Sequence, residues 1–257
     1  MAELRIGASG WAYKHWTGEF YTKGLKPQDA LCAYAEHFDT VEVNSSFYQL
    51  PGEETLARWL EETPQGFVFA WKASRFITHV KRLKDVGESL ELAFRRMHGL
   101  GERLGPLLFQ LPPNMKPDSV RLDAFLTLLP KDHRGAIEFR DPAWYESSTF
   151  DLLRAHGVAL CISDHHSAPA PKVTTTSFVY VRAHGPSGRY VGDYRDEALK
   201  ALADPIKGWL RKGFDVYAYF DNDIGAAAPR NAERLRALIK GRSCAPPRSA
   251  RPSRRSG

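Results

Sequence analysis

The sequence predicts an α/β protein of the (β/α)8 TIM-barrel class, built as a single domain. From residue 4 to residue 240, eight short runs rich in β-branched and aromatic residues alternate with longer amphipathic stretches, which is the pattern of parallel βαβ units. Eight such units in about 240 residues match the usual size of this barrel. Neither a GxGxxG nor a Walker motif follows any predicted strand, which disfavours an open nucleotide-binding sheet.

The predicted strands are short apolar runs bounded by Gly, Pro, Asn or Asp. They cover 4–8, 40–43, 67–72, 106–111, 136–139, 158–163, 178–183 and 216–220. The predicted helices between and after them cover 27–37, 53–62, 87–101, 118–128, 145–156, 195–212 and 226–240. One of these, 118–128, shows the helical period clearly, with apolar residues at Val120, Leu122, Phe125, Leu126 and, just beyond it, Leu129.

One crossover lacks a helical pattern. Residues 165–176 contain Pro169 and Pro171 and no amphipathic period, so we expect an extended loop in place of the sixth helix. Elsewhere proline stands at the joins between predicted elements, where it suits a loop or a first helical turn.

The composition is that of a globular protein, with 43% hydrophobic and 26% charged residues, and it excludes collagen-like, disulfide-scaffold and fully disordered classes. The net charge of +6 comes mainly from residues 242–257, which hold five arginines and no acid. Removing those five leaves 31 basic against 30 acidic residues. We therefore expect a barrel over 1–241 and a disordered basic tail over 242–257, either solvated without a partner or in non-specific contact with nucleic-acid phosphates.

The three cysteines are widely spaced and odd in number, which indicates reduced thiols and a cytoplasmic protein. No run approaches the ~20 apolar residues of a membrane span, so we expect no association with a membrane. The oligomeric state does not follow from the sequence.

A barrel of this class carries its active site at the carboxyl ends of the strands. The candidate residues at those positions are Ser9, Trp11, Glu42, Asn44, Lys72, Arg75, Gln110, Glu138, Arg140, Asp164, Arg182, His184, Asn222 and Asp223. Alternate residues of a strand share a face, so three pairs should point into the mouth together: Glu42 with Asn44, Glu138 with Arg140, and Arg182 with His184.

Several blocks of the chain resemble the YecE-like family, a domain of unknown function numbered seventy-two. The blocks run from Ile6 to Leu238 and include GASGWAYKHWTGEFY, FDTVEVNSSFYQLP, FAWKASRFITH, GPLLFQLPP, AIEFRDPAWY, VYVRAHG and VYAYFDND. The resemblance implies a TIM-barrel-like fold and no established activity. The chain departs from the family pattern at Asp221, where we expect Asn, so no role is assigned to that side chain.

The first functional hypothesis is an enzyme acting on a small phosphorylated or otherwise anionic substrate. Arg75, Arg140 and Arg182 would clamp the anion, because guanidinium groups suit bidentate contacts with phosphate or carboxylate. Glu42 and Glu138 would exchange protons, and Lys72 would be a further cationic clamp or an amine nucleophile. The other members of the predicted site are His184 and Asp223 on the catalytic side and Ser9, Trp11, Asn44, Gln110 and Asn222 on the substrate-binding side.

Three alternatives stay open. A divalent metal, as in phosphodiesterase, endonuclease or sugar-isomerase barrels, would be bound by Glu42, Glu138, Asp164 and His184. A nucleic-acid-binding barrel would use the basic third loop, 72–84, together with neighbouring aromatic residues. A non-catalytic barrel would keep the same charges as a structural ion-pair network that closes the mouth.

Overall fold

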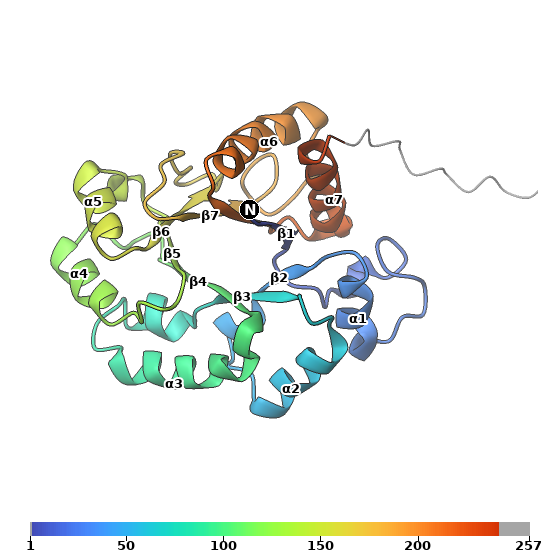
Figure 1. The fold of residues 1–257 in the computed structure, drawn as a ribbon, viewed down its shortest axis with the longest axis horizontal. Coiled ribbons are helices and arrows are strands. Elements are labelled where there is room, and N and C mark those ends of the chain that lie inside the picture. Colours follow the sequence, from blue (N-terminus) through green and yellow to red (C-terminus); the bar gives the residue numbers. More distant parts are fainter. Residues whose placement is uncertain (1, 242–257) are drawn as a thin grey trace, which may run out of the picture.

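The computed structural model describes residues 2–241 and forms a ring of eight parallel strands with helices outside it (Figure 1). The strands are β1 (Leu4–Ala8), β2 (Thr40–Val43), β3 (Val68–Lys72), β4 (Leu104–Gln110), β5 (Gly135–Glu138), β6 (Ala159–Ser163), β7 (Phe178–Ala183) and β8 (Asp215–Phe220). All are parallel, in the order β1-β8-β7-β6-β5-β4-β3-β2. The predicted TIM-barrel-like fold is confirmed.

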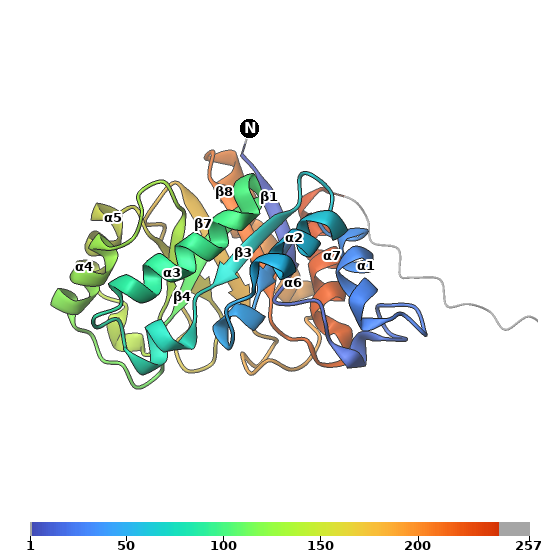
Figure 2. The same ribbon diagram turned by 90° about the horizontal axis from the view of Figure 1, so that it is seen from below.

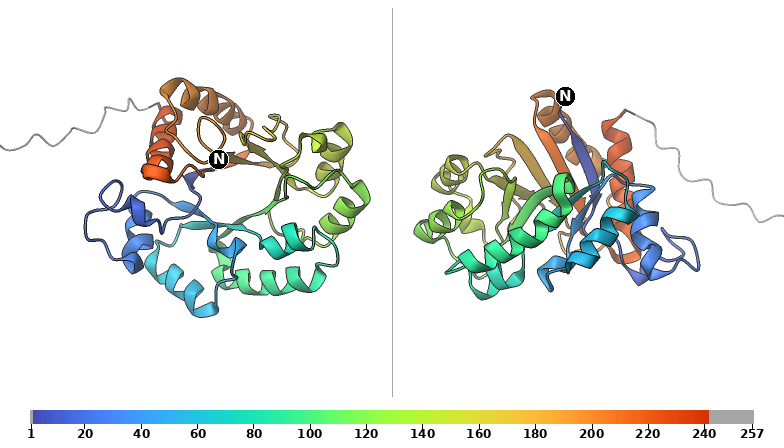
Figure 3. Two further views of the ribbon diagram at one scale, coloured as in Figure 1. Left: turned by 180° about the vertical axis from the view of Figure 1, so that it is seen from behind. Right: turned by 60° about the horizontal axis from the view of Figure 1, so that its bottom comes forward.

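The α-helices lie outside the strands, as two further views show (Figure 3). They are α1 (Ala30–Ala35), α2 (Glu53–Glu62), α3 (Gly87–Met97), α4 (Ser119–Thr127), α5 (Ser147–Ala155), α6 (Asp196–Arg211) and α7 (Ala227–Ile239). Within this part of the chain no helix connects β6 to β7, which confirms the extended loop expected there. The first helix is shorter than predicted, because Pro27–Asp29 forms a separate 3-10 turn before it.

The barrel is nearly closed rather than fully hydrogen-bonded. Between β1 and β2, the described backbone contains only an isolated bridge that pairs Ser9 with Glu42. The hydroxyl of Tyr34 stands in this seam, accepting from the Ala8 N–H at 2.7 Å and donating to the Thr40 carbonyl at 3.1 Å. Gly7 permits this close approach, since a Cβ at its position would lie 2.4 Å from the Thr40 oxygen.

Two apolar layers surround the strands. The outer layer packs the strands against the helices, and the inner layer fills the barrel. In the inner layer, small residues of β3, β5 and β6 face large ones of β7 and β8: Ala70, Ala136, Ala159, Cys161, Phe178, Tyr180, Tyr217 and Tyr219. This packed interior supports a set of buried polar side chains at the carboxyl ends of the strands.

Those carboxyl ends lie opposite the chain's N-terminus, at the lower side in Figure 2. The mouth of the barrel is therefore built by the loops after each strand, as expected for the class. No helix among residues 2–241 is long and apolar enough to cross a membrane. The basic tail predicted for 242–257 lies outside the described residues.

Candidate active site

Arg182 of β7 is the centre of the buried polar group at the barrel mouth. Its side chain is fully buried, and its Nε donates to Glu42 of β2 at 3.1–3.2 Å. Nη1 donates to Glu138 of β5 at 2.9 Å, and Nη2 donates to Glu42 at 2.8 Å and to Asp221 at 2.7 Å. Nη1 also lies 3.1 Å from His184 Nε2. Every N–H of the guanidinium therefore has a protein acceptor.

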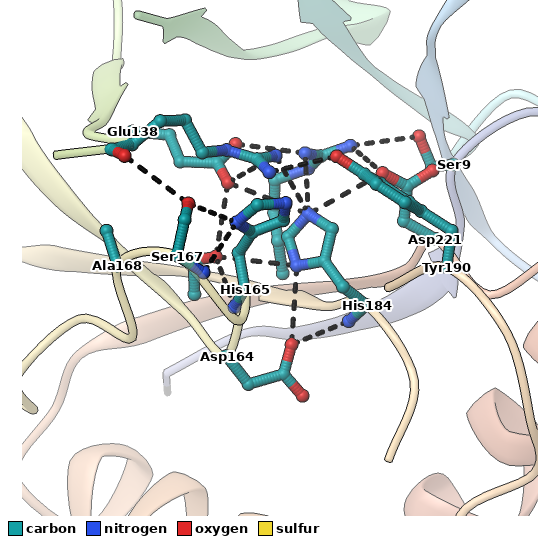
Figure 4. Close-up of polar contacts among 12 residues, drawn as sticks. Ser9, Glu138, Asp164, His165, Ser167, Ala168, His184, Tyr190 and Asp221 are labelled. Atoms are coloured by element: carbon teal, nitrogen blue, oxygen red, sulfur yellow. Dashed lines mark hydrogen bonds and ion pairs between the residues drawn. The ribbon is translucent and has the colours of Figure 1, made fainter. Parts of the chain in front are cut away.

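Arg140 extends this group toward the loop after β7, where Tyr190 lies beside His184 (Figure 4). Its Nη2 pairs with Glu138 at 2.8 Å and lies 3.1 Å from His184 Nε2, while Nη1 donates to the hydroxyl of Tyr190 at 2.9 Å. Because two arginines donate to Nε2 of His184, we assign the imidazole proton to Nδ1, which lies 3.3 Å from Asp164 Oδ1. The residues Glu42, Glu138, Arg140, Arg182, His184 and Asp221 are called the ion-pair cluster below.

Charge inside the cluster fixes the ionisation of Glu138. Burial opposes its ionisation, but the guanidinium groups of Arg140 and Arg182 outweigh that cost and hold its pKa well below the usual range. Ser163 Oγ adds a hydrogen bond to Glu138 at 3.1 Å. On the other carboxylate, Glu42 accepts from Tyr180 at 2.7 Å and from Ser9. Both glutamates are thus surrounded by donors.

The geometry corrects two expectations. Arg182 has no donor left for a substrate anion, so it does not serve as the predicted clamp. Glu42 and Glu138 are fully buried and held by guanidinium groups, so neither is suited to exchange protons with a substrate. The cluster matches the structural network considered as an alternative, and it lies beside the open part of the mouth.

A cavity of about 610 Å³ opens next to the cluster. It is lined by residues at the carboxyl ends of β3 and β4 and in the loops after β1, β2, β3, β7 and β8: Gly10, Trp11, Ala12, Tyr13, Asn44, Ser45, Phe47, Tyr48, Lys72, His79, Gln110, Tyr190, Asp221 and Asp223. The volume and the mixture of aromatic walls with a few polar groups are typical of small-molecule sites. We call this space the mouth cavity.

Lys72, the last residue of β3, is the buried cation of the mouth cavity. Its side chain is only 6% exposed, and its Nζ lies 4.4 Å from the ring centre of Phe47. Among residues 2–241, no carboxylate lies within the 4.0 Å of an ion pair with this ammonium. Burial, and then the nearby charge of Arg182, lower the pKa of Lys72 to about 8.

Two further titratable groups face the same space. Burial raises the pKa of Asp223, whose Oδ2 lies 3.4 Å from Nε2 of the exposed His15. His79 lies on a π-helical turn, Phe76–Val80, a rare conformation that occurs often at functional sites. Burial and the charge of Lys72 lower the pKa of His79 to about 4, so its imidazole is neutral at pH 7.

The remaining predicted residues fall into two groups. Trp11, Asn44 and Gln110 line the cavity with Lys72 and Asp223. Arg75 is exposed at the start of the π-helical turn and does not line it. Asn222 points away, because its Nδ2 donates to the Gly192 carbonyl and to Asn231 of α7. Ser9 is buried on the ion-pair cluster.

The four candidate metal ligands are not arranged around one point. Arg182 stands between Glu42 and Glu138, and His184 Nε2 accepts from two arginines. Asp164 lies on the far side of His184, where it also accepts from the hydroxyl of Tyr194. Within 2–241, no three His, Cys, Asp or Glu side chains are placed to bind a metal ion. The four side chains of that alternative therefore do not form a single site.

Comparison with known proteins identifies the family. The family described as "Protein of unknown function DUF72" matches residues 5–255. The chain belongs to the DUF72 family. A DUF72 family protein from Thermotoga maritima, known from its crystal structure, superposes with a TM-score of 0.85 at 29% identity, over 93% of this chain and 99% of that one.

Two curated proteins are also similar in sequence, and their names state no activity. The UPF0759 protein YunF of Bacillus subtilis is 26% identical over 92% of this chain and 94% of its own length. The UPF0759 protein YecE of Escherichia coli is 31% identical over 66% of this chain and 62% of its own length. The family match extends beyond Leu238, where the resemblance noted in the sequence ended.

Asp221 is a residue of the candidate site to which the sequence assigned no role. It belongs both to the ion-pair cluster and to the wall of the mouth cavity. Strand parity contains the signal for it, because Tyr217 and Tyr219 of β8 point into the barrel and Asp221 continues that face. Asn222 is on the opposite face, which explains its contacts with α7.

Proposed function

We propose that this DUF72 protein is an enzyme that binds a phosphorylated or otherwise anionic small molecule in the mouth cavity and transforms it by acid–base chemistry. The observation that carries the proposal is Lys72, a buried ammonium that faces the cavity without a carboxylate at ion-pair distance. A buried charge without a partner costs several kcal/mol, and an anionic ligand would offset that cost.

The anion contact is assigned to Lys72 and not to the arginines. Arg140 and Arg182 already donate to Glu138, Glu42 and Asp221. Their charges are balanced by the carboxylates of Glu42, Glu138 and Asp221, which leaves Lys72 as the cation among the described lining residues. The two arginines would thus hold the wall of the cavity in place without contacting the ligand.

The acid–base role is assigned to Asp223, with His79 as the second group. A carboxyl group transfers protons best when its pKa lies near the pH of the reaction, and burial raises that of Asp223. Glu138 has the opposite property, because its pKa is held low by Arg140 and Arg182.

We place the enzyme in the cytoplasm, since Cys32 and Cys161 are both free thiols.

The test combines binding and turnover. Calorimetry with inorganic phosphate, and with a panel of phosphorylated and carboxylated metabolites, would compare the wild type with Lys72→Met and Lys200→Met. Lys200 is exposed on α6, so its variant removes the same charge away from the cavity. We expect Lys72→Met to weaken anion binding at least about tenfold and Lys200→Met to leave it unchanged. Equal affinities in the wild type and Lys72→Met would overturn the proposal.

The metabolites that bind would then be assayed for turnover. Asp223→Asn removes the proposed proton carrier and should lower kcat about 100-fold or more, while the anion still binds. A variant with unchanged kcat would remove Asp223 from the proposed chemistry.

A further inference from the structure

We infer that the ligand of the mouth cavity carries several hydroxyl groups beside its anionic group, as a polyol phosphate or sugar phosphate does. This inference rests on the proposed function, because it takes Lys72 as the partner of the anion. It goes further by naming what recognises the rest of the ligand. Three oxygen acceptors and a set of aromatic side chains around the same cavity carry it.

The first acceptor is the side-chain oxygen of Asn44. Asn44 follows β2 and lines the cavity, and its Oδ1 is buried without a hydrogen-bond partner among the described residues. A buried acceptor without a donor costs about 1–3 kcal/mol. A ligand donor next to Asn44 would remove that cost.

The other acceptors are carboxylates at the end of β8. Asp221 uses Oδ2 for Arg182 Nη2 at 2.7 Å, and its Oδ1 has no hydrogen bond within the part of the chain that the structure describes. Asp223 has only His15 Nε2, at 3.4 Å from Oδ2, as a described ion-pair neighbour. Asn44, Asp221 and Asp223 therefore each have a side-chain oxygen available to accept a hydrogen bond from the ligand.

Hydroxyl groups fit these acceptors better than ammonium groups do. A hydroxyl donates a hydrogen bond without bringing positive charge, whereas an ammonium would enter a cavity that already contains Lys72. Asp221 already pairs with the guanidinium of Arg182, so its other oxygen takes a hydroxyl donor without needing a second cation. The donors of the ligand are therefore neutral, while its anionic group pairs with Lys72.

The aromatic residues suit the carbon skeleton of such a ligand. Trp11, Phe47, Tyr48 and Tyr190 line the cavity. Each makes a T-shaped ring contact with ring centres 5.1 Å apart: Trp11 with Trp59, Phe47 with Tyr48, and Tyr190 with His184. Flat aromatic faces pack against C–H groups, while hydroxyls at the edge of the same skeleton reach polar atoms. A volume of about 610 Å³ admits a five- or six-carbon phosphate.

The test uses three probes with the same five-carbon chain and the same phosphate: ribitol phosphate, pentyl phosphate and aminopentyl phosphate. Calorimetry on the full-length wild type should give ribitol phosphate at least about tenfold tighter binding than either of the others. Asn44→Leu removes one acceptor at similar volume and should weaken ribitol phosphate about tenfold, with pentyl phosphate unchanged. Lys72→Met should weaken all three.

Each contrary result has a distinct meaning. If pentyl or aminopentyl phosphate binds as tightly as ribitol phosphate, and Lys72→Met weakens them, the inference is overturned while the proposed function stands. If no probe binds the wild type, the inference is overturned, and the panel of phosphorylated and carboxylated metabolites decides the proposed function separately. Thermal unfolding without ligand shows whether Asn44→Leu is folded, and the comparison among probes on the wild type decides the question even if it is not.

Discussion

Arg182 and Glu42 are joined by three contacts, two from Nε at 3.1 and 3.2 Å and one from Nη2 at 2.8 Å. This pair connects β7 with β2 through the barrel interior, although the two strands are not neighbours in the sheet. Glu138, Asp221 and His184 take the remaining donors of the same guanidinium. One side chain therefore ties together residues at the ends of four strands.

Removal of Arg182 should destabilise the fold strongly. Arg182→Met leaves Glu42, Glu138 and Asp221 without their main counter-charge, so we expect a loss of about 3–5 kcal/mol in the free energy of unfolding. Urea denaturation measures it. Arg58→Met, which breaks an exposed pair with Glu62 on α2, should cost no more than about 0.5 kcal/mol. Similar losses in the two variants would contradict this account of the cluster.

The contribution of Glu138 to the free energy of unfolding should fall at acid pH. Its pKa is lowered from 4.5 in the folded protein, so its stabilising effect is complete above that pH and is lost as the pH falls through the folded-state pKa. The difference in unfolding free energy between the wild type and Glu138→Gln should therefore be constant from about pH 8 to about pH 5 and should narrow below pH 4.5. A difference that widens in acid would show the opposite linkage.

Lys72 should titrate at a lower pH than an ordinary lysine. Reductive methylation with ¹³C-formaldehyde labels the lysines for NMR, and the signal missing in Lys72→Met is expected to titrate near pH 8 in the wild type. Because the folded-state pKa lies below the 10.5 of an unperturbed lysine, Lys72 makes stability rise with pH between about 8 and 10.5. Saturating phosphate should raise the pKa, and a titration near 10.5 without phosphate would refute the assignment.

The hydroxyl of Tyr34 should contribute strongly to the free energy of unfolding. Tyr34→Phe leaves the Ala8 N–H and the Thr40 carbonyl without their shared partner, and we expect a loss of about 2–4 kcal/mol on unfolding. Tyr48→Phe removes a hydroxyl from a side chain that is 74% exposed and should be neutral within about 0.5 kcal/mol. Thermal and urea denaturation of both variants test this; equal stabilities would mean that the seam does not depend on Tyr34.

Much of the fold follows from local sequence signals. The strands lie within two residues of their predicted bounds, because Gly, Pro and Asp interrupt the apolar runs where the strands end. Parity along β2, β5 and β7 also brought Glu42, Glu138 and Arg182 to one place. Their mutual pairing could not be predicted from the sequence, because it depends on side-chain distances across the barrel and not on position along a strand.

The different roles of Arg182 and Lys72 at the mouth could not be predicted from the sequence either. A single sequence does not distinguish an arginine that binds a ligand from one that binds three carboxylates of its own protein. Only the geometry shows that the N–H groups of Arg182 are all used by protein acceptors. Lys72 differs from other lysines through its burial beside Phe47, which requires the loop after β2 to fold over β3. Cavity-forming loops are the part of a barrel that periodicity does not describe.

The seam between β1 and β2 gives the ring of strands two edges, and these edges set how the barrel would open. Native-state amide exchange reports such local opening, which begins where few backbone hydrogen bonds have to break. Amides of β1 that face β2 should therefore exchange before those of the β7–β8 pair, whose ladder is continuous from Phe178 to Ala183. Ser9, Gly10 and Asn44 lie at the mouth end of that seam, so a brief parting there would widen the route to the cavity without disturbing the rest of the sheet.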